Sequence, residues 1–332
     1  MLGYLVRRIL IMIPTMIAIS IVIFTIIHLP PGDYFSTYIA ELQSQGEKAN
    51  LAKIAFLKAQ YGFDKPLWEQ YLYWVVGLLH GDMGYSFLYD MPVNKVVGDR
   101  LLLTFVVSFV TILFTYAVAF PIGVYSATHQ YSMGDYTLTF LGFLGLATPS
   151  FLLALVLVYL AHVYFGISVG GLMDAKYLDK PWSWGKVGSV FAHIWIPVIV
   201  IGTAGTAAMI RRLRANLLDE LQKQYVVTAR AKGLHPLKVL FKYPLRLALN
   251  PFISDIGSLL PHVISGAAVV SVVMSLPTTG PMLLDALRGQ DMFLAGSFLM
   301  FMAFLTVIGV FLSDLALAAF DPRIRLHAGH GE

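Results

Sequence analysis

Residues 9–29 read ILIMIPTMIAISIVIFTIIHL, a run without Asp, Glu, Lys or Arg. About 20 apolar residues in a helix cross a hydrocarbon core of roughly 30 Å. Arg7 and Arg8 precede the run, and Pro30-Pro31-Gly32 follow it in place of the small-residue cleavage site of a signal peptide. We therefore expect a retained membrane-spanning helix at the start of the chain.

The rest of the 332-residue chain repeats this pattern. Hydrophobic residues make up 58% and charged residues 13%, against roughly 45–50% and about 25% in an average soluble domain. Further spans are expected at 101–125, 137–165, 190–210, 250–276 and 292–318. Three of them contain a proline expected to kink the helix: Pro149, Pro197 and Pro261. The sequence predicts an all-α membrane protein in which a single domain, residues 1–332, contains six transmembrane helices.

The distribution of positive charge predicts the orientation. Nine of the 23 Lys and Arg residues lie in the segment 211–249, and the six spans contain neither residue type. Because cytoplasmic segments retain Lys and Arg, 211–249 is expected inside and both termini with it. The segment 30–100 then forms a long external loop. The chain has no cysteine, which excludes disulfides, thiolate metal sites and a cysteine nucleophile.

The internal loop contains the start and stop signals of two helices joined by a turn. Good helix formers run from Asp219 to Lys232, and Gly233 stands where a left-handed residue ends a helix. Pro236 fits the first turn of a second helix. On these residues alone, a basic loop lying against anionic lipid is also possible. Nucleic-acid binding is excluded, because no recognition fold accompanies the basic residues beside the membrane.

A family resemblance rests on this loop. It reads Thr228-Ala229-Arg230-Ala231-Lys232-Gly233-Leu234, followed by Leu245-Arg246, and resembles the cytoplasmic signature of ABC importer permeases, in the variant of dipeptide/oligopeptide-type B subunits. Other segments follow in the order of that family: Met1-Leu2, Arg7-Arg8, Pro31-Gly32-Asp33, Tyr61-Gly62-Phe63-Asp64-Lys65-Pro66-Leu67, Gly81-Asp82-Met83-Gly84-Tyr85-Ser86, Ala147-Thr148-Pro149-Ser150-Phe151 and Asp321-Pro322-Arg323-Ile324-Arg325.

The resemblance implies a type I ABC importer permease in a bacterial-type inner membrane. Its implied partners are a second homologous permease, two ATP-binding subunits, an external solute-binding protein and membrane lipid. The implied ATPase-coupling residues are Thr228, Ala229, Arg230, Ala231, Lys232, Gly233, Leu234 and His235. Because the chain has no G-x-x-x-x-G-K-[ST] motif, ATP and Mg are expected in the partner ATPases. We expect no catalytic residue, metal or cofactor on this chain.

The resemblance also implies a substrate class, with di- and oligopeptides first. One segment departs from the family pattern: Ser271-Val272-Val273-Met274-Ser275-Leu276-Pro277-Thr278-Thr279-Gly280 lacks the usual Glu and one glycine. Oligosaccharides and nickel complexes therefore stay open as alternatives. The candidate translocation-path residues in this segment are Ser271, Met274, Thr278 and Thr279.

Two functions of other classes have sequence support. Gly166-Ile167-Ser168-Val169-Gly170 matches G-x-S-x-G, and an intramembrane serine protease would pair Ser168 with His193 or His262, with Asp174 in hydrolase order. A nucleophile elbow needs a strand before it. Because a span precedes this motif, we interpret it as a glycine turn.

A proton-coupled carrier is the second alternative. Asp255, Ser258 and His262 share one helix face, and ionisable groups inside spans are often functional. Asp255 and Asp314 both lie four or five residues from the expected cytoplasmic end of a span. We therefore expect these carboxylates to reach water or a juxtamembrane arginine.

Overall fold

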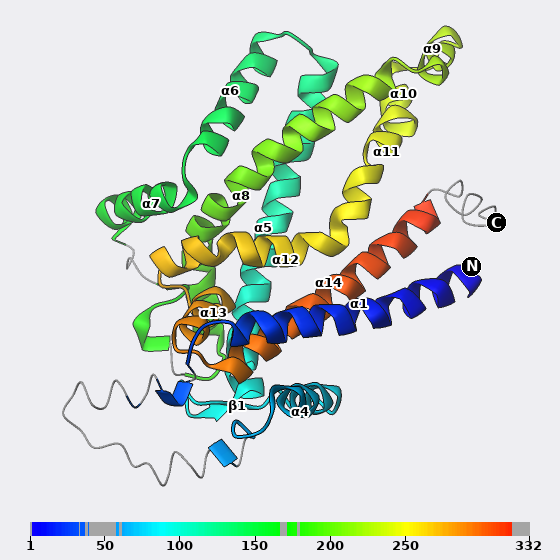
Figure 1. Ribbon diagram of the computed structural model, residues 1–332. Coiled ribbons are helices and arrows are strands. Elements are labelled where there is room, and N and C mark those ends of the chain that lie inside the picture. Colours follow the sequence, from blue (N-terminus) through cyan, green and yellow to red (C-terminus); the bar gives the residue numbers. More distant parts are fainter. Residues whose placement is uncertain are drawn as a thin grey trace. The chain divides into compact units, whose positions relative to one another are not determined.

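The computed structural model describes residues 2–32, 34–36, 39, 58–59, 62–166, 171–177 and 180–320, and it is almost entirely helical. The Asp321–Arg325 motif lies outside these ranges. Figure 1 shows the elements, which in chain order are α1 (Leu2–His28), α4 (Leu67–Leu79), β1 (Tyr85–Ser86), β2 (Met91–Pro92), α5 (Val93–Thr128), α6 (Met133–Ala147), α7 (Ser150–Phe165), η1 (Ala175–Tyr177), α8 (Trp184–Leu221), α9 (Gln224–Ala231), α10 (Pro236–Lys242), α11 (Pro244–Ala248), α12 (Asn250–Val273), α13 (Thr279–Arg288) and α14 (Met292–Phe320).

The chain divides into two compact units. The first comprises Met1–Leu103 and Thr278–Ile308, and the second comprises Thr104–Pro277 and Gly309–Glu332. In the first unit, the short antiparallel hairpin β1–β2 and helix α4 pack around a core that includes Trp74, Val93 and Leu294. Much of the expected external loop is therefore folded structure.

Asp291 connects parts of the first unit that are far apart in sequence. Its buried carboxylate accepts hydrogen bonds from the Ser86 hydroxyl at 2.6 Å, from the Leu88 N–H at 3.1 Å and from the Leu294 N–H at 3.1 Å. The last bond caps the N-terminus of α14. Burial raises the pKa of Asp291, although these hydrogen bonds oppose the shift. The hairpin is thus tied to the start of α14.

The second unit is built around α8, which packs against α6, α7, α11 and α12. Close approach depends in part on Gly202 of α8, where an added Cβ would come within 2.7 Å of the Phe114 ring of α5. A glycine in a helix does not by itself predict which residue faces it, so this contact could not be expected from the sequence.

Four described helical segments are long and apolar enough to cross a membrane: Val6–His28, Val93–Thr128, Trp184–Leu221 and Met292–Leu315. They contain the expected second and fourth spans and nearly all of the first and sixth. The expected fifth span falls on the continuous helix α12, of which His262–Val273 is the apolar segment among the described residues. The structure therefore supports a helical membrane protein with four or five such spans among the described residues, and the count of six stays a prediction.

The expected third span, 137–165, is two helices. α6 and α7 are bent by 100° at the break between them. Thr148 adopts an extended conformation, with φ −79° and ψ 122°, because the ring of a following proline disfavours the helical region. The expected kink at Pro149 is therefore a complete break, whereas Pro197 lies within the continuous helix α8.

Candidate functional site

A cavity of about 750 Å³ lies within the second unit. Its walls come from α5, α8 and α12, with Ser150 at the start of α7. The α8 wall is formed largely by small side chains, since Ala204, Gly205 and Ala208 line it and are exposed. Threonines 111 and 115 of α5 add hydroxyl groups. The cavity is thus wide and mixed in polarity, with room along α8 for a solute or another chain to approach the backbone.

One ion pair stands on the wall of this cavity. The Arg212 guanidinium of α8 donates a hydrogen bond to the Asp255 carboxylate of α12. The same guanidinium lies over the Phe252 ring, 4.6 Å from its centroid, in a cation–π arrangement. The expectation that Asp255 reaches a juxtamembrane arginine is confirmed. Asp314 is half-buried in α14.

The proposed proton-relay residues are only partly accounted for. Asp255 and His262 both line the cavity, in agreement with their shared helix face. The side chain of Ser258 lies outside the described residues. Because Asp255 is engaged by Arg212, its observed geometry favours an ion pair between helices over a chain of proton donors.

Helix α8 runs without interruption from the cavity to the segment that contains α9 and α10. It spans 38 residues, so that Ile201 to Arg212 line the cavity and the following turns reach the loop. Leu213 and Leu217 are fully buried there against Leu240 of α10 and Ala248 of α11. The expected fourth span ends at residue 210, but the helix that contains it continues to Leu221. Residues 211–221 contain no proline or glycine, and the helix continues because nothing stops it.

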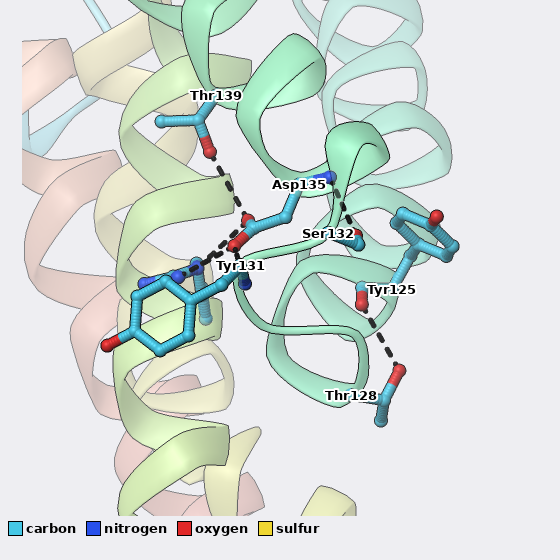
Figure 2. A network of polar contacts seen from close by, with 7 residues as sticks. Tyr125, Thr128, Tyr131, Ser132, Asp135 and Thr139 are labelled. Atoms are coloured by element: carbon cyan, nitrogen blue, oxygen red, sulfur yellow. Dashed lines mark hydrogen bonds and ion pairs between the residues drawn. The ribbon is translucent and has the colours of Figure 1, made fainter.

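A largely buried ion pair connects α8 to α6. Arg214 donates through Nε and Nη2 to the two carboxylate oxygens of Asp135 in α6, at 3.2 and 2.9 Å. Figure 2 shows the same carboxylate accepting from the Tyr131 N–H at 3.1 Å and from the Thr139 hydroxyl, while the Ser132 hydroxyl caps α6. The Asp135 side chain is only 3% exposed. The sequence analysis missed this pair, although Ser132 before an apolar run is a cap signal.

The loop itself begins with a tie between α8 and α9. The Tyr225 hydroxyl at the start of α9 donates a hydrogen bond to the Glu220 carboxylate at the end of α8. Burial and this hydrogen bond raise the pKa of Tyr225. Val226 and Ala229 of α9 pack against Val239 of α10 in a small core of their own. As Figure 1 shows, α9 and α10 lie together beyond the end of α8.

Gly233 ends α9 as expected. Its φ is +75°, and two hydrogen bonds close the helix: the Gly233 N–H donates to the Arg230 carbonyl at 2.9 Å and the Leu234 N–H to the Ala229 carbonyl at 3.4 Å. This is a Schellman motif, with Leu234 packed back on the helix. Pro236 occupies the first turn of α10. The glycine turn and the second helix are confirmed. The first helix, predicted over Asp219–Lys232, is instead interrupted: α8 ends at Leu221 and α9 begins at Gln224, after the extended residue Lys223.

The eight predicted coupling residues divide between a packed side and an open side. Ala229 is buried and Leu234 is half-buried. The other six are exposed: Thr228, Arg230, Ala231, Lys232, Gly233 and His235. The open side combines two positive charges with short side chains around the turn. Such a surface admits the close approach of a partner carrying negative charge.

The four candidate path residues lie elsewhere. Ser271 and Met274, at the end of α12, are buried, and the Met274 carbonyl accepts from the Gly171 N–H at 3.0 Å. Thr278 and Thr279, in the first unit, are also buried. None of the four is among the described residues that line the cavity. Their assignment to the path stays a prediction, and the cavity residues were not identified from the sequence.

The residues of the protease alternative are described in part. Ser168 lies outside the described residues, and Gly166 ends α7 with φ +64°. His193 is buried, with Nδ1 at 2.7 Å from the Ser189 carbonyl and Nε2 at 3.8 Å from the Asp174 carboxylate. In the described parts of the chain, no group of three or more His, Cys, Asp or Glu side chains gathers as a metal site would require.

Comparisons with known proteins agree with the helical architecture. Residues 119–326 match the family described as "Binding-protein-dependent transport system inner membrane component", and residues 1–110 match its N-terminal family. The dipeptide transport system permease protein DppB of Escherichia coli strain K12 is 31% identical over 98% of this chain and 99% of its own. The oligopeptide transport system permease protein AppB of Bacillus subtilis strain 168 is 32% identical with the same coverage.

A solved structure shows the same fold. One chain of the MetNI methionine ABC transporter, in an inward-facing conformation, superimposes with a TM-score of 0.53 at 15% identity, covering 68% of this chain and 97% of its own. The near full-length matches, together with the apolar helices, make this protein a membrane permease. The chain belongs to the family of binding-protein-dependent transport system inner membrane components.

Proposed function

We propose that this chain forms half of the translocation path of an ATP-driven importer for di- and oligopeptides. The names of the relatives DppB and AppB support the substrate class. A second homologous permease would supply the other half of the path, and an external solute-binding protein would deliver the substrate. Two ATP-binding subunits would hold ATP and Mg, since this sequence has no phosphate-binding loop.

The continuity of α8 carries the proposal. The same helix lines the cavity from Ile201 to Arg212 and ends at Leu221, where Glu220 is bonded to Tyr225 of α9. A helix of this kind moves as a stiff element, because each of its turns is hydrogen-bonded to the next. A displacement of α9 would therefore be transmitted to the cavity wall.

The exposed side of α9 and its turn would be the contact with an ATPase subunit. Thr228, Arg230 and Lys232 lie on this side, and the Schellman motif fixes the direction in which the chain leaves it. The orientation that follows has both termini and α9 in the cytoplasm of a bacterial-type cell. The excess of Lys and Arg in 211–249 supports it.

The cavity suits the chemistry of peptides. Peptides carry backbone amides and charged termini, and the wall offers threonine hydroxyls together with the Arg212–Asp255 pair. Because these two charges bond to each other, neither would hold a passing substrate strongly. A transport path needs such weak contacts, since the substrate must also leave it.

Reconstitution tests this function. The permease pair, the ATPases and the solute-binding protein in proteoliposomes are expected to accumulate a labelled dipeptide only when ATP is present. Accumulation of an oligosaccharide without any peptide uptake would contradict the substrate class. Peptide uptake driven by a proton gradient in the absence of ATP would contradict the mechanism.

A further inference from the structure

Helix α4 carries an apolar face that the first unit leaves open. Trp68, Leu72, Val76 and Leu79 are 64, 50, 50 and 80% exposed. At 100° per residue these four side chains share one side of the helix, and no charged residue lies among them. The opposite side holds Trp74, which is buried and donates a hydrogen bond from Nε1 to the Ser297 hydroxyl at 3.0 Å.

The depth of α4 follows from its contacts with α1. The hydroxyl groups of Ser20 and Tyr71 are hydrogen-bonded at 2.8 Å, and the Phe24 ring lies 5.4 Å from the Tyr71 ring. The membrane-spanning part of α1 is Val6–His28, so Ser20 lies about 12 Å inward from its end along the helix axis. Helix α4 therefore packs beside the last turns of α1 (Figure 1). With α1 spanning a bilayer, the Tyr71 side chain would lie at the level of the acyl chains.

A groove of about 530 Å³ separates the two helices on the open side. Its walls are mainly apolar and include Ile21 and Phe24 of α1, Leu29 just after it, and Leu67, Trp68 and Tyr71 of α4. The groove is continuous with the outer surface of α1, where Ile17, Ile21 and Ile26 are about half exposed. That surface faces lipid in a spanning helix, so the apolar surface runs unbroken from α1 to α4.

We infer that α4 is an interfacial helix whose open face, together with the groove beside α1, is covered by phospholipid acyl chains. The leaflet is the one reached by the C-terminal end of α1. A helix with one apolar side and a tryptophan at its edge is typical of this position. The lipid would hold α4, and the hairpin that follows it, at a fixed height on the membrane. This inference is independent of what the protein transports.

Trp68 is a built-in reporter for the test. The chain has five tryptophans, so the Trp68 signal must be isolated from the others. Subtracting the emission of the Trp68→Phe variant from that of the wild type gives this signal. The assembled transporter is placed in nanodiscs of phosphatidylcholine brominated at carbons near the headgroup or near the chain end, with unbrominated lipid as reference. The Trp74→Phe subtraction is the matched control from the buried side of the same helix.

Bromines nearer the headgroup are expected to remove about half of the Trp68 signal, because an interfacial indole meets that part of the acyl chain. Bromines near the chain end should quench less, the Trp74 signal should change less than the Trp68 signal, and aqueous iodide should leave Trp68 almost unaffected. Quenching by iodide without quenching by bromine would place α4 in water. Protection from both quenchers would mean that protein covers it. Either result would overturn the inference.

Discussion

Arg214 of α8 and Asp135 of α6 are joined by two hydrogen bonds although they lie 79 residues apart in the sequence. The pair stands between the part of α8 that lines the cavity and the part that leads to α9. It therefore fixes α6 to the segment of α8 through which motion of the loop would pass.

Removal of the Asp135 carboxylate tests whether this ion pair stabilises the contact between α6 and α8. Asp135→Ala leaves the Arg214 guanidinium without its carboxylate in a site where the arginine is only 28% exposed, and is expected to lower the free energy of unfolding by about 3 kcal/mol. Thermal unfolding of the purified protein measures the change. The matched control is Glu69→Ala, which breaks the exposed pair with Lys65 at 3.9 Å and should cost less than about 1 kcal/mol. Equal effects of the two variants would argue against this stabilisation.

Gly233 tests the turn that ends α9. Proline cannot adopt φ +75° and has no N–H to donate to the Arg230 carbonyl. Gly233→Pro is therefore expected to leave the transporter largely assembled while ATP hydrolysis no longer drives uptake. Gly233→Asn is the control, because asparagine tolerates the left-handed region and no atom lies within 4 Å of the added Cβ. Normal uptake by the proline variant would defeat the assignment.

Asp291 is expected to make the stability of the first unit depend on pH. Burial raises its pKa in the folded state, so the folded protein keeps this proton to a higher pH than the unfolded chain does. The stabilising contribution is then complete below the unfolded pKa and is lost as pH rises through the folded pKa. Unfolding of the wild type should become easier across this window, and Asp291→Asn, which has no proton to lose, should show a flatter profile. A profile unchanged by the substitution would contradict the assignment.

Substitution of Asp255 distinguishes an ATP-driven importer from a proton-coupled carrier. The Asp255 and Arg212 side chains are 39 and 46% exposed, so loss of the pair should cost less than about 1 kcal/mol. Asp255→Asn is expected to retain ATP-driven uptake, and an uncoupler should have no effect on either protein in proteoliposomes. A carrier that used Asp255 as its proton site would lose uptake in both experiments.

Local sequence signals predicted where helices begin and end better than they predicted the contacts between helices. Gly233 and Pro236 identified the end of α9 and the start of α10, because left-handed backbone and a missing N–H are properties of single residues. Local rules also account for the extended Thr148 before Pro149 and for the continuation of α8 through residues 211–221, which contain no proline or glycine. The angle of 100° between α6 and α7 is a tertiary feature, which the sequence pattern does not contain. The Asp135–Arg214 pair is a contact across 79 residues, and neither residue type predicts its partner.

The central claim is that α9 contacts an ATPase subunit. The chain has no native cysteine, so Thr228→Cys, on the exposed side of α9, introduces a single thiol for cross-linking in the assembled transporter. We predict a cross-link from position 228 to the ATPase that changes in yield with ATP, and none from Trp184→Cys at the opposite end of α8, where the native side chain is 90% exposed. An equal cross-link from both positions, or none from position 228, would contradict the claim.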